Sequence, residues 1–356
     1  MQQYDHGGDI YGPNPPVLDF SISLNPVGPP RKVLEAAREA VLDWNRYPDP
    51  RCRGLRRAAA LRHGVPEENI LFGSGASDLI DRFLRAGQPG HALLLAPTFS
   101  EYRRVLEAQG CQIQEHALLQ EKGFAATHRL LDAIRPGVEL VFLCDPNNPT
   151  GRRMEPDLLG EVLDRCRAAG AFLAVDQCFL ELSEGDPDAL VGELDRGGLI
   201  LFRALTKSYA LAGLRLGYCL CGDRGLLEVM ERLAPPWPVS APAQAAGETA
   251  LTEFPDWPRR TLPLLARERE RLTWELGRLG LWVCRSSANF LLFQGPPGLG
   301  ERLLDGQGVL LRDCGSFRGL PDRGWYRIGL RQEEDNTRLI QALGEVLGTP
   351  PPDSAG

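Results

Sequence analysis

The sequence predicts an α/β protein: a large domain with a mostly parallel sheet flanked by helices, joined to a smaller α+β domain. From about residue 70 onward, short apolar runs alternate with amphipathic stretches of helical length. Such alternation is typical of a parallel sheet whose strands are connected by helices. A proline-dense segment, residues 234–238, interrupts the pattern. A long helical stretch and two further apolar runs follow it, which indicates the second domain.

The elements are expected in the following order. Residues 1–20 are rich in Gly, Pro and Asp without a helical period, which predicts an extended N-terminal arm. Apolar residues on one face predict a helix over residues 31–44. Buried strands are expected at residues 92–96, 140–144, 171–175 and 199–202, with helices at 100–109 and 156–169. Beyond the proline-dense segment we expect a helix at 258–279, apolar runs at 289–293 and 309–311, and a last helix at 334–347.

These elements set the expected domain boundaries. Residues 21–48 contribute to the small domain, residues 49–240 form the large domain, and residues 241–348 return to the small one. Residues 349–356 are expected to be a disordered tail because they are short, polar and proline-rich.

Composition excludes several classes of protein. With 356 residues and a net charge of −7, the chain is an unsuitable partner for nucleic acid or an anionic membrane surface. No apolar stretch approaches the roughly 20 residues of a membrane span, so we expect a cytoplasmic protein. The nine cysteines are scattered without paired CxxC motifs, which predicts small core residues and no metal site.

Lysine is rare, which narrows the search for amine chemistry. The sequence contains only Lys32, Lys122 and Lys207. Lys32 opens an amphipathic helix and Lys122 lies in a Glu-Lys-Gly turn, so both are expected on the surface. Lys207 comes just after an apolar run, where a lysine removed from water can form a Schiff base.

Polar motifs follow several of the predicted strands, at the edge where open α/β sheets bind ligands. The small residues of 71–78 would let backbone N–H groups approach an anion at a helix start, although a glycine-rich turn would look the same. The turn at 144–151 contains two Asn and two Pro, and it either is purely structural or presents Asn148 as a donor. Asp176 ends an apolar run, where a carboxylate requires a cation or a donor. Arg215 is suited to a phosphate.

The order of these motifs resembles that of fold-type I, class I/II aminotransferases, enzymes dependent on pyridoxal 5′-phosphate (PLP). The matching segments are Gly-Ser-Gly-Ala-Ser (73–77), Asn-Pro-Thr-Gly (148–151), the strand-ending Asp176, Thr206-Lys207 and Gly-Leu-Arg-Leu-Gly (213–217). The resemblance covers essentially the whole chain and implies that residues 49–240 bind PLP. It also implies a homodimer.

The resemblance implies a role for each matching position. Lys207 would hold the cofactor as a Schiff base and move protons. Asp176 would keep the ring nitrogen protonated, Asn148 would bind the ring's phenolic oxygen, and Tyr102 would stack on the ring. The phosphate would be held by Gly75, Ala76, Ser77, Thr206 and Arg215, and by Tyr47 from the neighbouring subunit.

Two subfamilies fit best: L-threonine-O-3-phosphate decarboxylases of cobalamin synthesis and histidinol-phosphate aminotransferases. Both act on a small phosphorylated amino compound. The arm and Phe179, at a position where the aminotransferases usually have Tyr, are similar to the decarboxylases. The expected substrate contacts are Arg327 and Asn25 for the carboxylate, His6 and Arg312 for the phosphate, and Asn148.

Three functions follow from this resemblance. A decarboxylase would release carbon dioxide and form (R)-1-aminopropan-2-yl phosphate, whereas a transaminase would transfer the amino group; a small rotation of the substrate separates the two. A non-catalytic sensor is disfavoured because no room for a DNA-binding domain is expected before Asp19. The sequence departs from relatives at Ala204, where they have Ser or Thr, and at Gln177-Cys178, where they have Glu-Ala.

Overall fold

A seven-stranded sheet forms the centre of the larger part of the molecule. The computed structural model describes residues 6–11, 16, 18–321 and 323–348. The strand order is β2-β8-β7-β6-β5-β3-β4, and β8 alone runs antiparallel to its neighbours in this sheet. The strands are β2 (Ile70–Gly73), β3 (His91–Ala96), β4 (Gln112–Ala117), β5 (Leu140–Cys144), β6 (Phe172–Asp176), β7 (Leu199–Ala204) and β8 (Gly217–Cys221).

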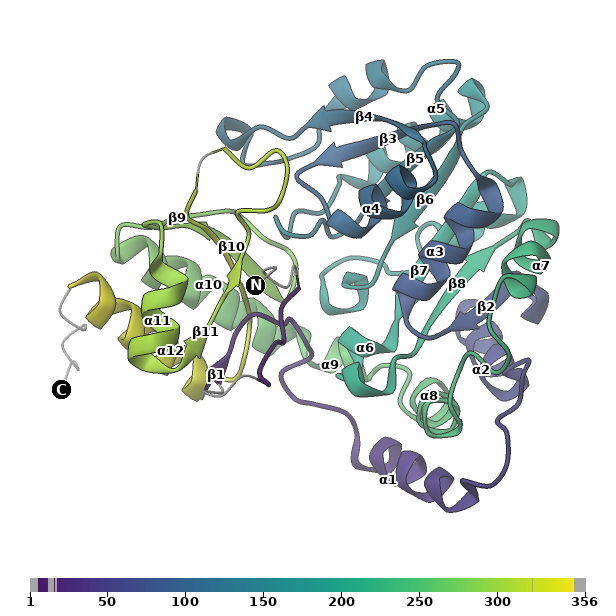
Figure 1. The fold of residues 1–356 in the computed structure, drawn as a ribbon, viewed down its shortest axis with the longest axis horizontal. Coiled ribbons are helices and arrows are strands. Elements are labelled where there is room, and N and C mark those ends of the chain that lie inside the picture. Colours follow the sequence, from purple (N-terminus) through teal and green to yellow (C-terminus); the bar gives the residue numbers. More distant parts are fainter. Residues whose placement is uncertain (1–5, 12–15, 17, 322, 349–356) are drawn as a thin grey trace.

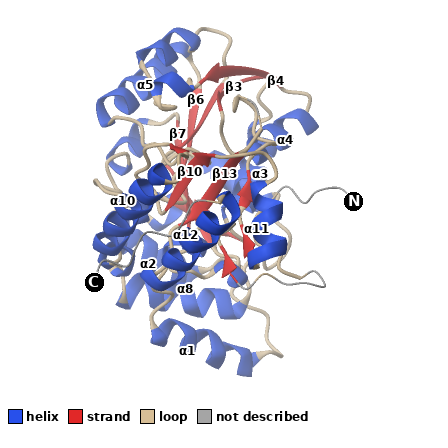
Figure 2. Cartoon of the chain, turned by 90° about the vertical axis from the view of Figure 1, so that its left-hand side faces the viewer, coloured by secondary structure: helices blue, strands red, loops and turns tan. Residues whose placement is uncertain are grey.

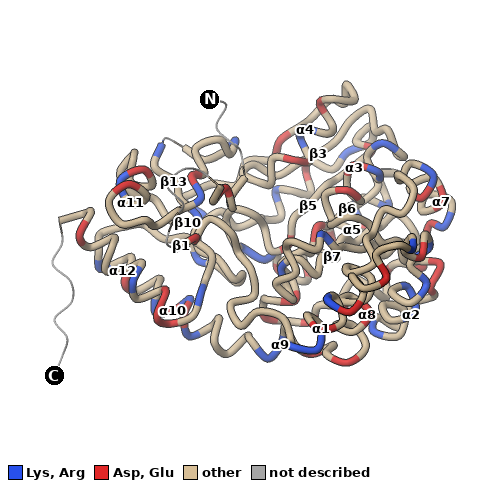
Figure 3. Tube along the Cα trace, turned by 60° about the horizontal axis from the view of Figure 1, so that its bottom comes forward, with Lys and Arg blue, Asp and Glu red and all other residues tan. Residues whose placement is uncertain are grey.

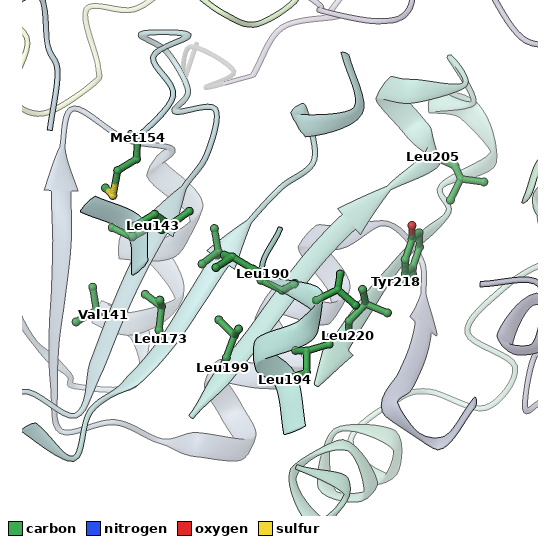
Figure 4. Packing of buried hydrophobic residues seen from close by; sticks show 14 of the residues in the cluster. Val141, Leu143, Met154, Leu173, Leu190, Leu194, Leu199, Leu205, Tyr218 and Leu220 are labelled. Carbon is green, nitrogen blue, oxygen red and sulfur yellow. The ribbon is translucent and has the colours of Figure 1, made fainter. Parts of the chain in front are cut away.

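Helices cover both faces of this sheet (Figure 1). Successive side chains of a strand point to opposite faces, so fully apolar strands such as β5 supply two cores. One core packs α2 (Arg53–His63), α5 (Pro156–Ala169) and α8 (Ala241–Glu253) against the sheet, and Figure 4 shows part of it. The other contains α3 (Ala76–Gly87), α4 (Ser100–Ala108) and α7 (Arg224–Arg232).

The smaller part is built on an antiparallel sheet with the order β12-β13-β10-β9. Its strands are β9 (Trp282–Val283), β10 (Phe290–Gln294), β12 (Arg312–Asp313) and β13 (Trp325–Gly329). The helices α10 (Leu262–Arg278), α11 (Leu299–Gln307) and α12 (Glu333–Leu347) lie over β10 and β13 (Figure 2) and share an apolar core with them. Beside them, β1 (Leu18–Asp19) pairs in parallel with β11 (Val309–Leu310).

The division of the chain between the two parts differs from the sequence prediction. Leu18 and Phe20 pack in the smaller core, so the arm ends before residue 18 rather than at residue 20. Val33 of α1 (Arg31–Ala40) lies in the larger core, where α1 packs along α8. The sequence prediction assigned residues 21–48, and residues from 241 onward, to the small domain, whereas α1 packs on α8 and both contribute side chains to the larger core. The predicted tail, residues 349–356, lies outside the described residues.

Two predicted helices are interrupted. The α-helix expected over 31–44 ends at Ala40 and continues as a 3₁₀ turn, Val41–Asp43. The helix expected over 258–279 is divided into α9 (Trp257–Arg260) and α10. Pro263 in the first turn of α10 has no N–H to donate, which favours a new helix start there over continuation of α9.

The surface carries both signs of charge. Acidic and basic residues are interspersed over the helices of both parts (Figure 3). Within the described chain, no helix is both long enough and apolar enough to cross a membrane.

Candidate active site

Three predicted polar residues follow neighbouring strands of the large sheet. Asp176 is the last residue of β6, Lys207 lies in the short helix α6 (Leu205–Ser208) directly after β7, and Asn148 follows β5. Because β5, β6 and β7 are parallel neighbours, their carboxyl ends meet at one edge of the sheet. The fold therefore brings these three residues to the same edge.

The Asp176 carboxylate is buried and is held by two donors. Its Oδ2 accepts a hydrogen bond from the Tyr102 hydroxyl at 2.6 Å, and its Oδ1 accepts one from the Cys178 backbone N–H at 3.0 Å. Burial, followed by the charge of Asp176, raises the pKa of Tyr102 well above its usual value, so this hydroxyl stays protonated. A buried carboxylate fixed in this way is suited to pair with a protonated ring nitrogen.

The stacking role expected for Tyr102 does not fit its surroundings. Its ring has no exposed surface and stacks on Phe142, with ring centroids 4.1 Å apart. Tyr102 therefore offers no open face to a cofactor and instead orients Asp176. Phe99, immediately before α4, is partly exposed at a centroid distance of 5.5 Å from Tyr102, and it is the better candidate for stacking. Phe99 was not predicted from the sequence, although its place directly after the Pro97-Thr98 turn was a usable signal.

The Lys207 amine lies among apolar and cationic groups. Its Nζ is 5.8 Å from the centroid of the Phe179 ring. Burial, followed by the positive charges of Arg327 and Arg215, lowers the pKa of Lys207 from 10.5 to about 8. A lysine with this pKa is partly neutral near physiological pH, so it can act as a nucleophile and can both accept and donate a proton.

The predicted phosphate loop lies at the start of α3. Gly75 has a φ of +84°, and a Cβ there would come within 2.8 Å of Arg215 Nη2, so the Arg215 guanidinium lies directly against this glycine. Gly217 allows β8 to approach the backbone N of Ala76, which a Cβ at 217 would meet at 2.6 Å. Ser77 is exposed at the helix start, whereas Thr206 is buried in α6. The N-terminus of a helix and an adjacent arginine suit a phosphate dianion.

Two arginines on neighbouring strands form a second cationic group. Arg327 of β13 and Arg312 of β12 are cross-strand partners, so their side chains leave the same face of the sheet. Arg327 donates from Nη1 to Asn148 Oδ1 at 2.5 Å and from Nη2 to the Ser21 carbonyl at 2.9 Å. Its Nε is buried without a hydrogen-bond partner among the described residues. Burial lowers the pKa of Arg327 to about 10, so it is protonated at neutral pH.

The Asn25 side chain, expected to contact the substrate carboxylate, has protein partners at both ends of its amide. Its Nδ2 donates to the Ser208 carbonyl at 2.9 Å, while its Oδ1 accepts from the Thr261 hydroxyl at 3.2 Å and the Val27 N–H at 3.1 Å. Its backbone N–H also donates to the Lys207 carbonyl at 3.0 Å. Asn25 is thus a buried link between α6 and the start of α10, with its amide occupied by protein groups.

The described part of the arm lies beside the small sheet. His6 Nε2 is 3.3 Å from Glu101 Oε1, and its ring lies 6.0 Å from that of Phe99. His6 and Arg312 line one cavity of about 700 Å³ between the arm, α11 and the loop that follows β12. The two residues predicted to bind the substrate phosphate therefore line the same cavity.

Tyr47 lies apart from these groups in the same chain. It is 77% exposed and stacks on Trp237 with ring centroids 4.0 Å apart. Val41, Leu42 and Trp44 near it are exposed as well, at 54%, 79% and 84%. These four residues and Trp237 form an apolar patch on the surface.

A buried polar network explains the departure at Gln177. Arg203 donates to Gln177 Oε1 at 3.2 Å from Nη2 and to Asp188 Oδ1 at 3.0 Å from Nη1. Asp188 also contacts His63 Nδ1 at 2.9 Å. Although burial opposes it, these two partners hold the pKa of Asp188 well below its usual range. Asp188 therefore supplies the negative charge that neutralises Arg203. Because of this, residue 177 does not need to be a carboxylate.

Comparisons with known proteins identify the family of this chain. The family model described as aminotransferase class I and II matches residues 15–343. Threonine-phosphate decarboxylase of Salmonella typhimurium is 36% identical over 98% of this chain and 98% of that protein. Histidinol-phosphate aminotransferase 1 of Archaeoglobus fulgidus is 31% identical over 93% of this chain and 100% of that protein.

A solved structure gives the same fold. Histidinol-phosphate aminotransferase from Sinorhizobium meliloti in complex with pyridoxal-5′-phosphate superposes with a TM-score of 0.83 at 23% identity, covering 94% of this chain and 91% of that one. The predicted α/β fold and cofactor are confirmed. The chain belongs to the class I and II aminotransferase family and is an enzyme dependent on pyridoxal 5′-phosphate.

Proposed function

We propose that this enzyme decarboxylates L-threonine O-3-phosphate to (R)-1-aminopropan-2-yl phosphate and carbon dioxide. The observation that carries the proposal is the pair of neighbouring arginines, Arg327 and Arg312, at the edge of the site. The substrate has one carboxylate and one phosphate, and each arginine can bind one of them through two parallel hydrogen bonds. The similarity to the Salmonella decarboxylase over nearly the full length supports the same reaction.

The residues present fit PLP. Asp176 would meet the ring nitrogen, Phe99 the ring face, and Asn148 the phenolic oxygen, while the Gly75–Ser77 loop, Thr206 and Arg215 would hold the phosphate. When bound, the cofactor accepts the electron pair of the bond that breaks.

The chain's own groups then decide which bond that is. Arg327 would hold the carboxylate through its unpartnered Nε and one Nη, with Asn148 fixing the guanidinium plane. Arg312 and His6 would hold the phosphate at the other end. With the carboxylate held in this way, its C–C bond would be the one that breaks and carbon dioxide would leave. The Lys207 ammonium would then be placed to donate a proton to the α-carbon. Buried, fixed donors make this orientation precise at little further entropic cost.

A second candidate is transamination, as in histidinol-phosphate aminotransferase. The relative from Archaeoglobus fulgidus, matched over its whole length, favours it. In that reaction Lys207 would remove a proton from the α-carbon instead of donating one. Histidinol phosphate has no carboxylate, so it would leave Arg327 without an anionic partner in that half of the reaction.

The test is a single-turnover experiment on the purified holoenzyme. It is mixed with L-threonine O-3-phosphate, and carbon dioxide and the visible absorbance of the cofactor are followed together. Release of carbon dioxide with recovery of the initial absorbance supports the decarboxylase. Conversion of the cofactor to its amine form without carbon dioxide contradicts it and favours a transaminase, for which histidinol phosphate is the next substrate.

We also propose that the enzyme is a homodimer. The apolar patch of Val41, Leu42, Trp44, Tyr47 and Trp237 is too hydrophobic for a free surface, and a second copy would bury it. The resemblance to the family further suggests that Tyr47 reaches the partner's cofactor phosphate.

A further inference from the structure

A small cavity outside the proposed active site has a cationic wall. Its volume is about 200 Å³, and it lies between β2, the start of α2 and the proline-dense segment after α7. Arg51, Arg56 and Arg82 line it, together with the carboxylate of Glu231. Arg215, which lies against the predicted phosphate loop, is not part of this wall.

Arg82 is an unusual residue for its position on α3. Its neighbours Leu79 and Phe83 are buried, and Arg82 itself is only 1% exposed. Nε and Nη2 donate to the two oxygens of Asp78, the former at 3.0 Å. Nη1 is hidden from solvent and has no hydrogen-bond partner in the part of the chain that the structure describes. Buried N–H groups left in this state are costly unless a further acceptor binds them.

Arg56 on α2 repeats this pattern. Its Nη2 donates to Glu231 Oε1 at 2.8 Å, but its Nε is buried and also lacks a partner among the described residues. The arginines of the wall outnumber the carboxylates even when Asp78 is counted with Glu231. Burial raises the pKa of the Cys52 thiol, also in the wall, to about 11, so this group adds no negative charge at neutral pH.

We propose that this cavity binds a small oxyanion, either inorganic phosphate or the phosphate group of a small ester. Guanidinium groups pair with phosphate oxygens through short, charge-assisted hydrogen bonds, which would supply acceptors for Arg82 Nη1 and Arg56 Nε. The volume suits such an ion and is below the roughly 300 Å³ at which pockets for larger cofactors and drug-sized ligands begin.

The site also has a connection to the predicted cofactor loop. Asp78, the partner of Arg82, accepts a hydrogen bond from the Ser74 backbone N–H at 2.8 Å. An anion bound to Arg82 would compete with Asp78 for this guanidinium. It would therefore alter the hydrogen bond that Asp78 makes to the loop before α3. This cavity would bind the anion whether the enzyme is a decarboxylase or a transaminase, because the substrate is not involved.

The test is calorimetric titration of the holoenzyme with inorganic phosphate, at constant ionic strength set with chloride. Arg312→Met serves as the background, which removes phosphate binding at the proposed substrate site. In this background, one phosphate per chain is expected to bind, in the cavity lined by Arg56 and Arg82. Adding Arg82→Met or, on a different helix, Arg56→Met should weaken this binding about tenfold or more, because each removes charge-assisted hydrogen bonds.

Arg85→Met is the matched control. Arg85 also belongs to α3, but its side chain is exposed and pairs with Asp81 at the surface. Its loss should therefore leave the phosphate affinity unchanged. Glycerol 3-phosphate, titrated in parallel, distinguishes an ester from the free ion; tighter binding of either supports the site. The proposal would be overturned if neither phosphate nor the ester bound in the Arg312→Met background. It would also be overturned if adding Arg56→Met or Arg82→Met left the phosphate affinity equal to that of the Arg312→Met parent. The first of these results is expected if an acidic side chain of a second copy fills the cavity.

Discussion

At the residue scale, the charge state of Lys207 depends on its neighbours. Burial and the positive charges of Arg327 and Arg215 lower the pKa of this amine to about 8. The unfolded chain, with a pKa near 10.5, therefore binds the extra proton between these two pH values. This group makes the free energy of unfolding of the cofactor-free protein rise with pH across that window, and its contribution falls as the pH drops toward 8.

The same shift predicts how the cofactor is captured. Only the neutral amine reacts with an aldehyde, so the rate at which visible absorbance appears should rise about tenfold per pH unit below pH 8 and level off above it. Arg327→Met should raise the pKa of Lys207 and move the midpoint upward. Lys207→Ala should abolish the band, whereas Lys122→Ala, at an exposed turn, should not change it. A rate of cofactor capture that does not change between pH 6.5 and 8 would argue against a lowered pKa of Lys207.

Tyr102 and Phe99 can be distinguished by substitution. Tyr102→Phe keeps the packing on Phe142 but removes the hydroxyl that donates to Asp176. We expect kcat to fall about tenfold, or about 1.4 kcal/mol, with KM nearly unchanged, because the lost bond is to a charged group that tunes the cofactor. Phe99→Leu should instead weaken cofactor affinity, measured by fluorescence titration. Loss of cofactor affinity in Tyr102→Leu but not in Phe99→Leu would restore Tyr102 as the stacking residue.

At the scale of elements, the strands were the most predictable features. The apolar run at 140–144 coincides with β5, and the run at 171–175 differs from β6 by one residue at each end. Strands buried on both faces show as unbroken apolar runs, so their positions are visible in the sequence. Helix limits were less predictable because they depend on single residues such as Pro263, and on tertiary packing such as that of α1 against α8.

The short 3₁₀ turn after α1 carries much of the apolar patch, which leads to a prediction about assembly. Trp44→Glu should shift the protein from dimer toward the 39.2 kDa monomer in light scattering at micromolar concentration, because a charge would be buried in the interface. Trp274→Glu is the control, since Trp274 on α10 is 59% exposed and lies under Arg278 away from the patch. An unchanged mass for Trp44→Glu would place the interface elsewhere.

At the scale of the whole molecule, the candidate site combines residues from both parts of the chain. Asp176, Lys207 and Asn148 could be predicted because each follows a strand whose direction the sequence implied. The partners of Arg327 could not, since Ser21 and Asn148 are 306 and 179 positions away in the sequence. Ser21 lies beside β13 within the smaller part, whereas Asn148 meets Arg327 only where the two parts pack together. The same holds for Asn25, whose sequence position suggested a substrate contact while its partners, Ser208 and Thr261, lie far along the chain.

Asn25 therefore provides the last prediction, because replacing a buried structural link and replacing a substrate ligand have different effects. Asn25→Ala should lower the free energy of unfolding by about 2–3 kcal/mol in a denaturant titration, since buried hydrogen bonds to Ser208 and Thr261 are lost together. Thr261→Val, which removes only one of these bonds, should cost about 1 kcal/mol. Neither change should raise KM as strongly as Arg327→Met. That substitution removes a guanidinium whose unpartnered Nε is proposed to bind the substrate carboxylate. A stable Asn25→Ala variant with a greatly raised KM would show instead that the amide binds the carboxylate, and that its bonds to α6 and α10 open when substrate enters.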